Sequence, residues 1–111
     1  MYYVKKTLEI SAAHSLTLPY DSKCTTLHGH NWLITICCRA QQLNANGMVT
    51  DFSHIKQFIT DTFDHRNLNQ VLAPLNPTAE NMARYICEHI ENCYRVEVCE
   101  SSGNTAAYEI D

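Results

Sequence analysis

The sequence has few basic residues: 8 Lys and Arg against 12 Asp and Glu, for a formal net charge of −4 over 111 residues. These basic residues are mixed with acidic ones along the chain and form no stripe. A protein that follows nucleic-acid phosphates needs such a stripe. We therefore expect no nucleic-acid partner, and we expect a few local cations to hold any anionic ligand.

Long apolar runs are also missing. None approaches the about 18 apolar residues of a membrane-spanning helix. The N-terminal segment MYYVKKTLEI has neither an apolar core nor a small-residue cleavage site of the kind found in secretory signals. From these absences we expect no membrane partner, no signal peptide and a cytoplasmic location.

Six cysteines are present, and in a secreted chain they would suggest disulfides. Without a secretory signal the reduced state is the better interpretation, so we expect free or metal-linked thiols. Five of them are typical of small apolar packing residues: Cys37, Cys38, Cys87, Cys93 and Cys99.

Three segments show the alternation of strands. Residues 2–13 place apolar side chains on one face and polar ones on the other, and residues 30–40 are rich in β-branched and aromatic residues. Residues 94–111 alternate twice around Ser102-Gly103-Asn104, which predicts a hairpin. The hairpin therefore supplies a third and a fourth strand.

Two helices are predicted between the second and third strands. Asp51 can cap a helix that runs to about Phe63, and Thr78 can cap a second helix with Glu80 in its first turn. The polar stretch 64–76 between them reads as a connector.

The predicted element order is ββααββ in one domain over residues 1–111. This order indicates an α+β fold, with a four-stranded antiparallel sheet and two helices on one face. Such a sheet has two open edges, and proteins tend to pair or cover exposed edges. Oligomerisation through the edges is therefore a reasonable hypothesis.

The strongest chemical signal is a group of three histidines. His28 and His30 flank Gly29, so on an extended backbone both imidazoles lie on the same face. His14, at the end of the first strand, shares the parity of that strand's apolar residues. A lone histidine at a strand end is usually a partly buried polar residue. Three together match the composition of a catalytic zinc site with one open position.

Cys24, four residues before His28, admits two interpretations. It is either a fourth zinc ligand that closes a structural site, or a nucleophile or base off the metal. A nearby cation and imidazole lower a thiol pKa and make thiolate available near neutral pH. The spacing alone does not separate these interpretations.

Two carboxylates are weaker candidates. Asp64 precedes His65, and a histidine beside a carboxylate is a plausible acid–base group, although a solvated loop explains the pair as well. Glu100 has the parity of the apolar face of its strand. It either points inward, where it could accept two N–H bonds from an aminopyrimidinone ring, or it is solvated beyond the strand end.

Six motifs occur in a familiar order: Ala12-Ala13-His14, Cys24-x3-His28-Gly29-His30, Val49-Thr50-Asp51-Phe52, Asp64-His65-x-Asn67-Leu68-Asn69, Pro77-Thr78-Ala79-Glu80-Asn81 and Glu100-Ser101. Together they resemble the 6-pyruvoyl-tetrahydropterin synthase family over nearly the whole chain. The short spacing from cysteine to histidines resembles the bacterial 6-carboxy-tetrahydropterin synthase branch, since animal pyruvoyl enzymes have a longer gap.

The resemblance implies a tunnelling fold, in which sheets of three subunits join into a barrel and two trimers stack into a homo-hexamer. It also implies roles for residues. His14, His28 and His30 would hold Zn²⁺. Cys24 would be the base.

Asp64 and His65 would assist Cys24, with a neighbouring subunit as their source. Glu100 would anchor the pterin ring, next to Ser101, which stands where the family pattern leads us to expect threonine but keeps the hydroxyl. The implied reaction converts 7,8-dihydroneopterin triphosphate to 6-carboxy-5,6,7,8-tetrahydropterin, with release of acetaldehyde and triphosphate, on the route to queuosine. Three cations are candidates for holding the triphosphate: Lys23, Arg66 and Arg84.

Three other functions fit the same residues. The pyruvoyl branch eliminates triphosphate without cleaving the side chain. A structural zinc module would use Cys24 as a fourth ligand and bind no pterin. A zinc hydrolase would rely on metal-bound water, so Cys24→Ala would keep its activity.

Overall fold

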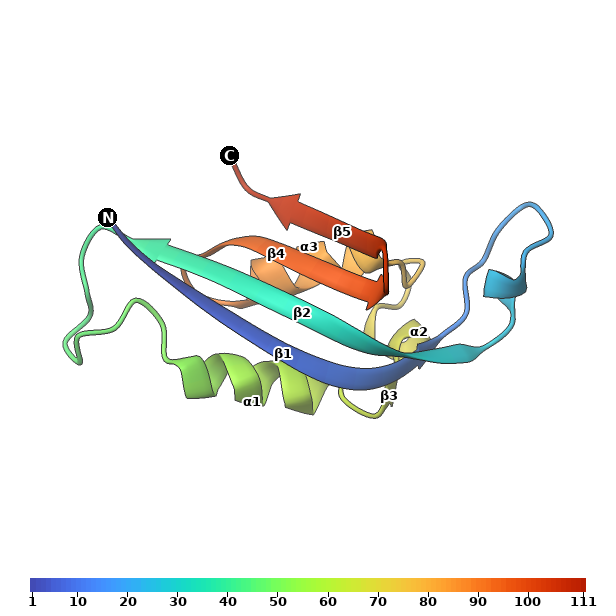
Figure 1. Cartoon of the computed structure of the whole chain (residues 1–111), viewed down its shortest axis with the longest axis horizontal. Helices are drawn as coiled ribbons and strands as arrows, with labels where there is room; N and C mark the ends of the chain where they lie inside the picture. Colours follow the sequence, from blue (N-terminus) through green and yellow to red (C-terminus); the bar gives the residue numbers. More distant parts are fainter.

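The computed structural model describes all of residues 1–111. Its elements are, in chain order, β1 (Tyr2–His14), the 3-10 turn η1 (Lys23–Thr25), β2 (His28–Ala40), α1 (Phe52–Phe63), β3 (Arg66–Asn67), α2 (Leu68–Val71), α3 (Ala79–His89), β4 (Cys93–Ser101) and β5 (Asn104–Glu109). Figure 1 shows one twisted sheet in which β1 and β2 are the two long, neighbouring strands. The predicted α+β class is confirmed.

The sheet has five strands in the order β3-β1-β2-β4-β5. All neighbours are antiparallel except β1 and β3, which pair in parallel at Ala12 and Ala13. The expectation of four antiparallel strands and two helices was thus incomplete. The segment 64–76, predicted as a connector, contains β3 and the short helix α2. Neither is long enough to show a repeating hydrophobic pattern, because β3 spans two residues and α2 four.

The two long helices begin where the sequence predicts. The Asp51 side chain accepts a hydrogen bond from the Ser53 amide at 2.8 Å, and Thr78 accepts one from the Asn81 amide at 3.1 Å. Both are side-chain caps that satisfy an amide with no partner inside the helix. Helix α1 ends at Phe63, also as predicted.

Both long helices cover the same face of the sheet. Helix α1 lies against β1, and α3 lies against β4 and β5. The sheet contributes alternate residues to this buried face, including Ile10, Trp32, Ile34 and Val98. Even positions on β1, β2 and β4 therefore point to the helices, and this parity decides which side of the sheet His14, His28, His30 and Glu100 occupy.

The connection from β1 to β2 carries η1 away from the body of the molecule. Figure 1 shows this loop reaching past the end of the sheet. At the sheet edges, β3 covers only two residues of β1 and β5 has no outer neighbour, so strand edges are open within one chain. No helix has the length and apolarity needed to cross a bilayer.

Candidate active site

Three histidines meet at one end of the sheet, on its helix-covered face. His14 and His28 are direct partners across the β1–β2 pair, and His30 follows His28 on the same face of β2. One ring nitrogen from each of the three lies within 4.8 Å of the others. The sequence prediction that they gather is therefore confirmed by the geometry.

Backbone carbonyls orient two of the rings. Nδ1 of His14 lies 2.7 Å from the Pro77 carbonyl, and Nδ1 of His28 lies 2.7 Å from the Thr26 carbonyl. A carbonyl only accepts hydrogen bonds, so each Nδ1 must carry the proton. Each Nε2 is then left with a free lone pair, which is the tautomer that metal-binding histidines use.

Two of these nitrogens are buried without a partner. Nε2 of His14 and Nε2 of His30 have no hydrogen bond, and His14 is only 1% exposed. A buried polar atom with no partner is costly and rare in folded proteins. The three imidazoles together could hold a metal ion, which would give these nitrogens a partner.

The protonation state of His30 agrees with this interpretation. Burial lowers its pKa below the usual value of 6.5, which the Glu100 carboxylate opposes and the neighbouring His14 and His28 reinforce. At neutral pH the ring is therefore mainly neutral, and neutral imidazole is the form that binds a metal ion.

Glu100 points into the site. Its Oε1 lies 3.4 Å from Nε2 of His30 and its Oε2 lies 3.8 Å from Nε2 of His14, while its side chain is 25% exposed. The inward interpretation of Glu100 is therefore confirmed. Ser101 points elsewhere, because its hydroxyl accepts a hydrogen bond from the Asn104 side chain at 2.9 Å in the β4–β5 turn.

Cys24 is in η1 and does not join the histidine cluster. Its amide donates to the Ser22 hydroxyl at 3.1 Å, and its carbonyl accepts from the Leu16 amide at 2.8 Å. Both bonds involve only its backbone and hold the loop together. The structural-module interpretation requires Cys24 as a fourth zinc ligand. In this structure the Cys24 side chain is not grouped with the three histidines.

Asp64 and His65 lie at the β3 edge of the sheet. The Asp64 carboxylate accepts a bond from the Ser11 amide at 2.9 Å, and the His65 amide donates to the Ser11 carbonyl at 2.6 Å. The two side chains approach each other at 3.8 Å. They can do so because His65 has a φ of 58° and is not extended, so the opposed directions of neighbours on a strand do not apply.

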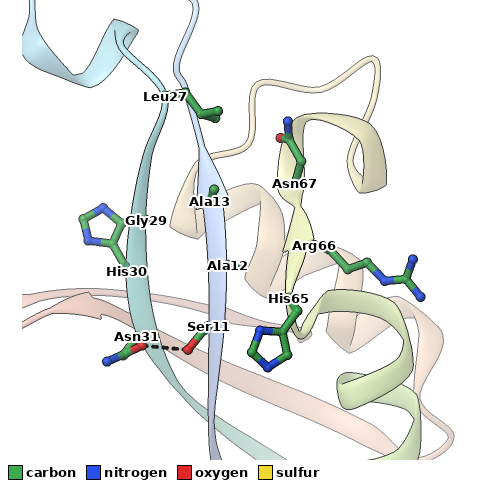
Figure 2. Close-up of a pocket in the computed structure, with 10 residues that line it drawn as sticks. All are labelled: Ser11, Ala12, Ala13, Leu27, Gly29, His30, Asn31, His65, Arg66 and Asn67. Carbon is green, nitrogen blue, oxygen red and sulfur yellow. Dashed lines mark hydrogen bonds between the residues drawn. The ribbon is translucent and has the colours of Figure 1, made fainter.

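Within one chain, β1 separates this pair from the histidine cluster. Figure 2 shows His65 and Arg66 on one side of β1 and His30 on β2 on the other. These three residues border an open pocket of about 590 Å³, and the His65 side chain is 81% exposed. The structure therefore brings Glu100 to the three histidines but leaves Cys24, Asp64 and His65 apart from them.

The chain is similar to proteins of a known family. The profile of the family described as "6-pyruvoyl tetrahydropterin synthase" matches residues 3–111. The chain belongs to this family. It is 31% identical to the 6-carboxy-5,6,7,8-tetrahydropterin synthase of Synechocystis sp., over 97% of this chain and 93% of that protein. It is 34% identical to a putative 6-carboxy-5,6,7,8-tetrahydropterin synthase of Archaeoglobus fulgidus, over 86% and 85% of the two chains.

A solved structure agrees with the family assignment. The chain superposes on the 6-pyruvoyl tetrahydropterin synthase of Caenorhabditis elegans with a TM-score of 0.78 and 27% identity, over 99% of this chain and 96% of that one. The tunnelling fold expected from the resemblance is therefore confirmed. As a member of this family, the chain is a pterin synthase with a small-molecule substrate.

Sequence reasoning missed the groups that orient the histidines. They are the carbonyls of Thr26 and Pro77. A backbone carbonyl has no sequence signature, since every residue has one. The one available signal is that Pro77 lies next to the helix cap Thr78, which ties its position to the start of α3.

Proposed function

We propose that the protein is a zinc-dependent 6-carboxy-5,6,7,8-tetrahydropterin synthase. It would convert 7,8-dihydroneopterin triphosphate to 6-carboxy-5,6,7,8-tetrahydropterin, with release of acetaldehyde and triphosphate. The observation that carries the proposal is the histidine cluster, with two buried Nε2 atoms that have no partner. The names of the relatives from Synechocystis and Archaeoglobus favour the carboxy product.

His14, His28 and His30 would hold the metal. When bound, Zn²⁺ supplies Lewis acidity toward the oxygens of the substrate side chain. The carbonyls of Pro77 and Thr26 hold two of the rings in the binding tautomer, so the cluster is organised before any ligand arrives. This preorganisation reduces the cost of assembling the site during turnover.

Glu100 is proposed to anchor the pterin. The aminopyrimidinone edge presents adjacent N–H donors, and a carboxylate accepts two such bonds with its two oxygens. Because Glu100 lies beside His14 and His30, a pterin bound there places its side chain next to the histidine cluster. Ser101 is a less direct candidate for substrate contact, since its hydroxyl is already bonded to Asn104.

Cys24 is proposed as the base that removes a proton from a carbon of the substrate side chain. The thiol has a suitable position in sequence, on the loop that joins the strands of His14 and His28. The loop begins directly after His14 and ends directly before His28, and Figure 1 shows it reaching past the end of the sheet. Closure of this loop over the bound pterin would bring Cys24 to the reacting carbon.

Asp64 and His65 are proposed to act from a neighbouring subunit. Their separation from the histidine cluster by β1 favours this source, as does the high exposure of His65. The open edges at β1 and β5 favour assembly through the sheet. We propose a cytoplasmic homo-hexamer, a dimer of trimers, in which one subunit supplies the metal ligands and another supplies this pair.

Arg66 is the best placed of the three candidate cations for the triphosphate. It borders the pocket beside His65, where its guanidinium makes only one bond, to the Asp61 carbonyl at 3.3 Å. Arg84 is already engaged by Glu88 at 3.5 Å, on the exposed side of α3. Lys23 lies next to Cys24 on η1 and would arrive with the loop.

The test is to incubate the zinc-loaded protein with 7,8-dihydroneopterin triphosphate and identify the products by mass spectrometry. Acetaldehyde together with carboxy-pterin is the expected result. Cys24→Ala should abolish both products, while Cys37→Ala is the matched control because Cys37 is half-buried toward the other end of β2.

Other outcomes point to the other functions. A pyruvoyl product without acetaldehyde would assign the chain to the reaction for which its relative from Caenorhabditis elegans is named. Full activity in Cys24→Ala would favour a hydrolase-like mechanism with a metal-bound water as the base. Tight zinc binding with no turnover of any pterin would contradict the proposed reaction and leave a structural role.

A further inference from the structure

The contacts between Glu100 and the histidines are not hydrogen bonds. The distances from Oε1 to Nε2 of His30 and from Oε2 to Nε2 of His14 are 3.4 and 3.8 Å. A charged N–H···O bond is about 2.7–2.9 Å long. Nε2 of both histidines indeed remains without any hydrogen-bond partner, although a carboxylate lies within 4 Å of each. The carboxylate oxygens and the two imidazole nitrogens therefore lie close together with no hydrogen bond between them.

The spacing matches that of two ligands on one metal ion. Ligand atoms about 2.0–2.2 Å from a tetrahedral zinc are about 3.3–3.6 Å from one another. The Glu100–His30 distance of 3.4 Å lies in this range, and the Glu100–His14 distance of 3.8 Å lies just above it. No ion pair joins Glu100 to His28, so the carboxylate occupies the side of the cluster next to His14 and His30.

From this geometry we propose that Glu100 is the fourth ligand of the metal ion when no pterin is bound. The inference rests on the metal site of the proposed function and adds a second role for the residue. Charge favours it, because three neutral imidazoles leave the full charge of a divalent cation uncompensated and a carboxylate reduces that charge. The fold favours it too, because β4 ends beside the histidines and holds Glu100 on the covered face.

The same carboxylate then has two competing partners. A pterin that engages both of its oxygens with N–H donors draws the carboxylate away from the metal. Binding of the ring would thus open a coordination position at the moment when the substrate side chain can occupy it. Without pterin, the metal ion would have no free coordination position for water or a small anion. Binding of the pterin ring would provide one.

The test uses the cobalt-substituted protein, because the visible spectrum of Co²⁺ reports the number and type of its ligands without any turnover. The spectrum of the wild-type protein should change when 7,8-dihydroneopterin, which has no triphosphate to lose, is added. Glu100→Ala should have an altered spectrum before any pterin is added, and millimolar acetate should shift it back toward that of the wild type. Glu100→Ala should also bind Zn²⁺ at least about tenfold more weakly in competition with a chromophoric chelator.

Glu97→Ala is the matched control. Glu97 lies on the same strand but on the other face, where it pairs with Arg95 at 3.2 Å. The cobalt spectrum and the zinc affinity of Glu97→Ala should equal those of the wild type. Identical cobalt spectra for Glu100→Ala and the wild type in the absence of pterin would overturn the inference, even if acetaldehyde formation upholds the proposed function. Absence of both cobalt and zinc binding by the wild type would refute both proposals.

Discussion

The layer between the sheet and its helices holds three side chains that can bind metal ions at each of its two ends, yet only one end has the geometry of a site. At one end are His14, His28 and His30. At the other are three buried cysteines, Cys38, Cys87 and Cys93, of which Cys38 and Cys93 are partners across β2 and β4. The comparison shows that residue type alone does not make a metal site.

The difference lies in where the polar atoms point and whether they carry protons. The Cys87 thiol donates to the Cys93 carbonyl at 3.7 Å, and the Cys93 thiol donates to the Arg95 carbonyl at 3.6 Å. Burial raises the pKa of Cys87, and the hydrogen bond with Cys38 together with burial raises the pKa of Cys93. The Cys87 and Cys93 thiols therefore stay protonated and hydrogen-bonded, whereas two buried histidine nitrogens have no partner.

The largest effect is expected at the histidine end, where substitution of one histidine should release the metal ion. His28→Ala removes one of the three proposed ligands, so zinc content after dialysis should fall from one per chain to near zero. Metal analysis measures it, with circular dichroism to check the fold. His54→Ala, whose side chain is 78% exposed on α1, is the matched control and should keep its zinc. Stoichiometric zinc in His28→Ala would show that the cluster is not the metal site.

A second large effect concerns the two sides of β1. Asp64→Ala should lower turnover by about 10²- to 10⁴-fold if the carboxylate takes part in proton transfer. His28→Ala should also be inactive, for lack of metal. If subunits share sites, unfolding the two variants together and refolding them as mixed oligomers should restore a measurable fraction of activity in the acetaldehyde assay. Mixtures as inactive as the separate variants would place both groups in the same subunit.

A smaller effect is expected at the cysteine end. Cys87→Ala removes a buried sulfur that is only 4% exposed, and it should reduce the free energy of unfolding by about 1–2 kcal/mol. Zinc content and turnover should not change, because the thiols bind no metal. Urea denaturation and metal analysis give both quantities. A loss of zinc equal to that of His28→Ala would make the two ends equivalent.

The smallest expected effect is a pH dependence of stability. The pKa of Cys87 is raised from 9.0 by burial, so the folded thiol stays protonated when the unfolded one ionises. Its contribution to stability is complete below about pH 9 and is lost as pH rises toward the folded pKa. Urea midpoints between pH 8 and 10.5 should therefore fall less steeply in Cys87→Ala than in the wild type. Parallel profiles would show that Cys87 does not titrate on unfolding.

The burial pattern of the long strands, the shared face of the three histidines and the starts of the long helices are determined locally by the sequence. Alternation over β1 and β2 predicts which residues are buried, and the same parity predicts that His14, His28 and His30 share a face. The caps at Asp51 and Thr78 predict where the long helices begin. These features depend on the period of a strand or on contacts between neighbours in sequence, and such information is complete within a short window.

Only the tertiary structure decided the rest. The approach of Glu100 to the histidines depends on the register of β4 against β2, and the separation of Asp64 and His65 from them depends on β3 joining the far edge of β1. The orienting carbonyls of Thr26 and Pro77 depend on how the loops close. Most of these contacts join residues that are far apart in sequence, and they depend on backbone groups that every residue carries. No local pattern in a single sequence therefore predicts them.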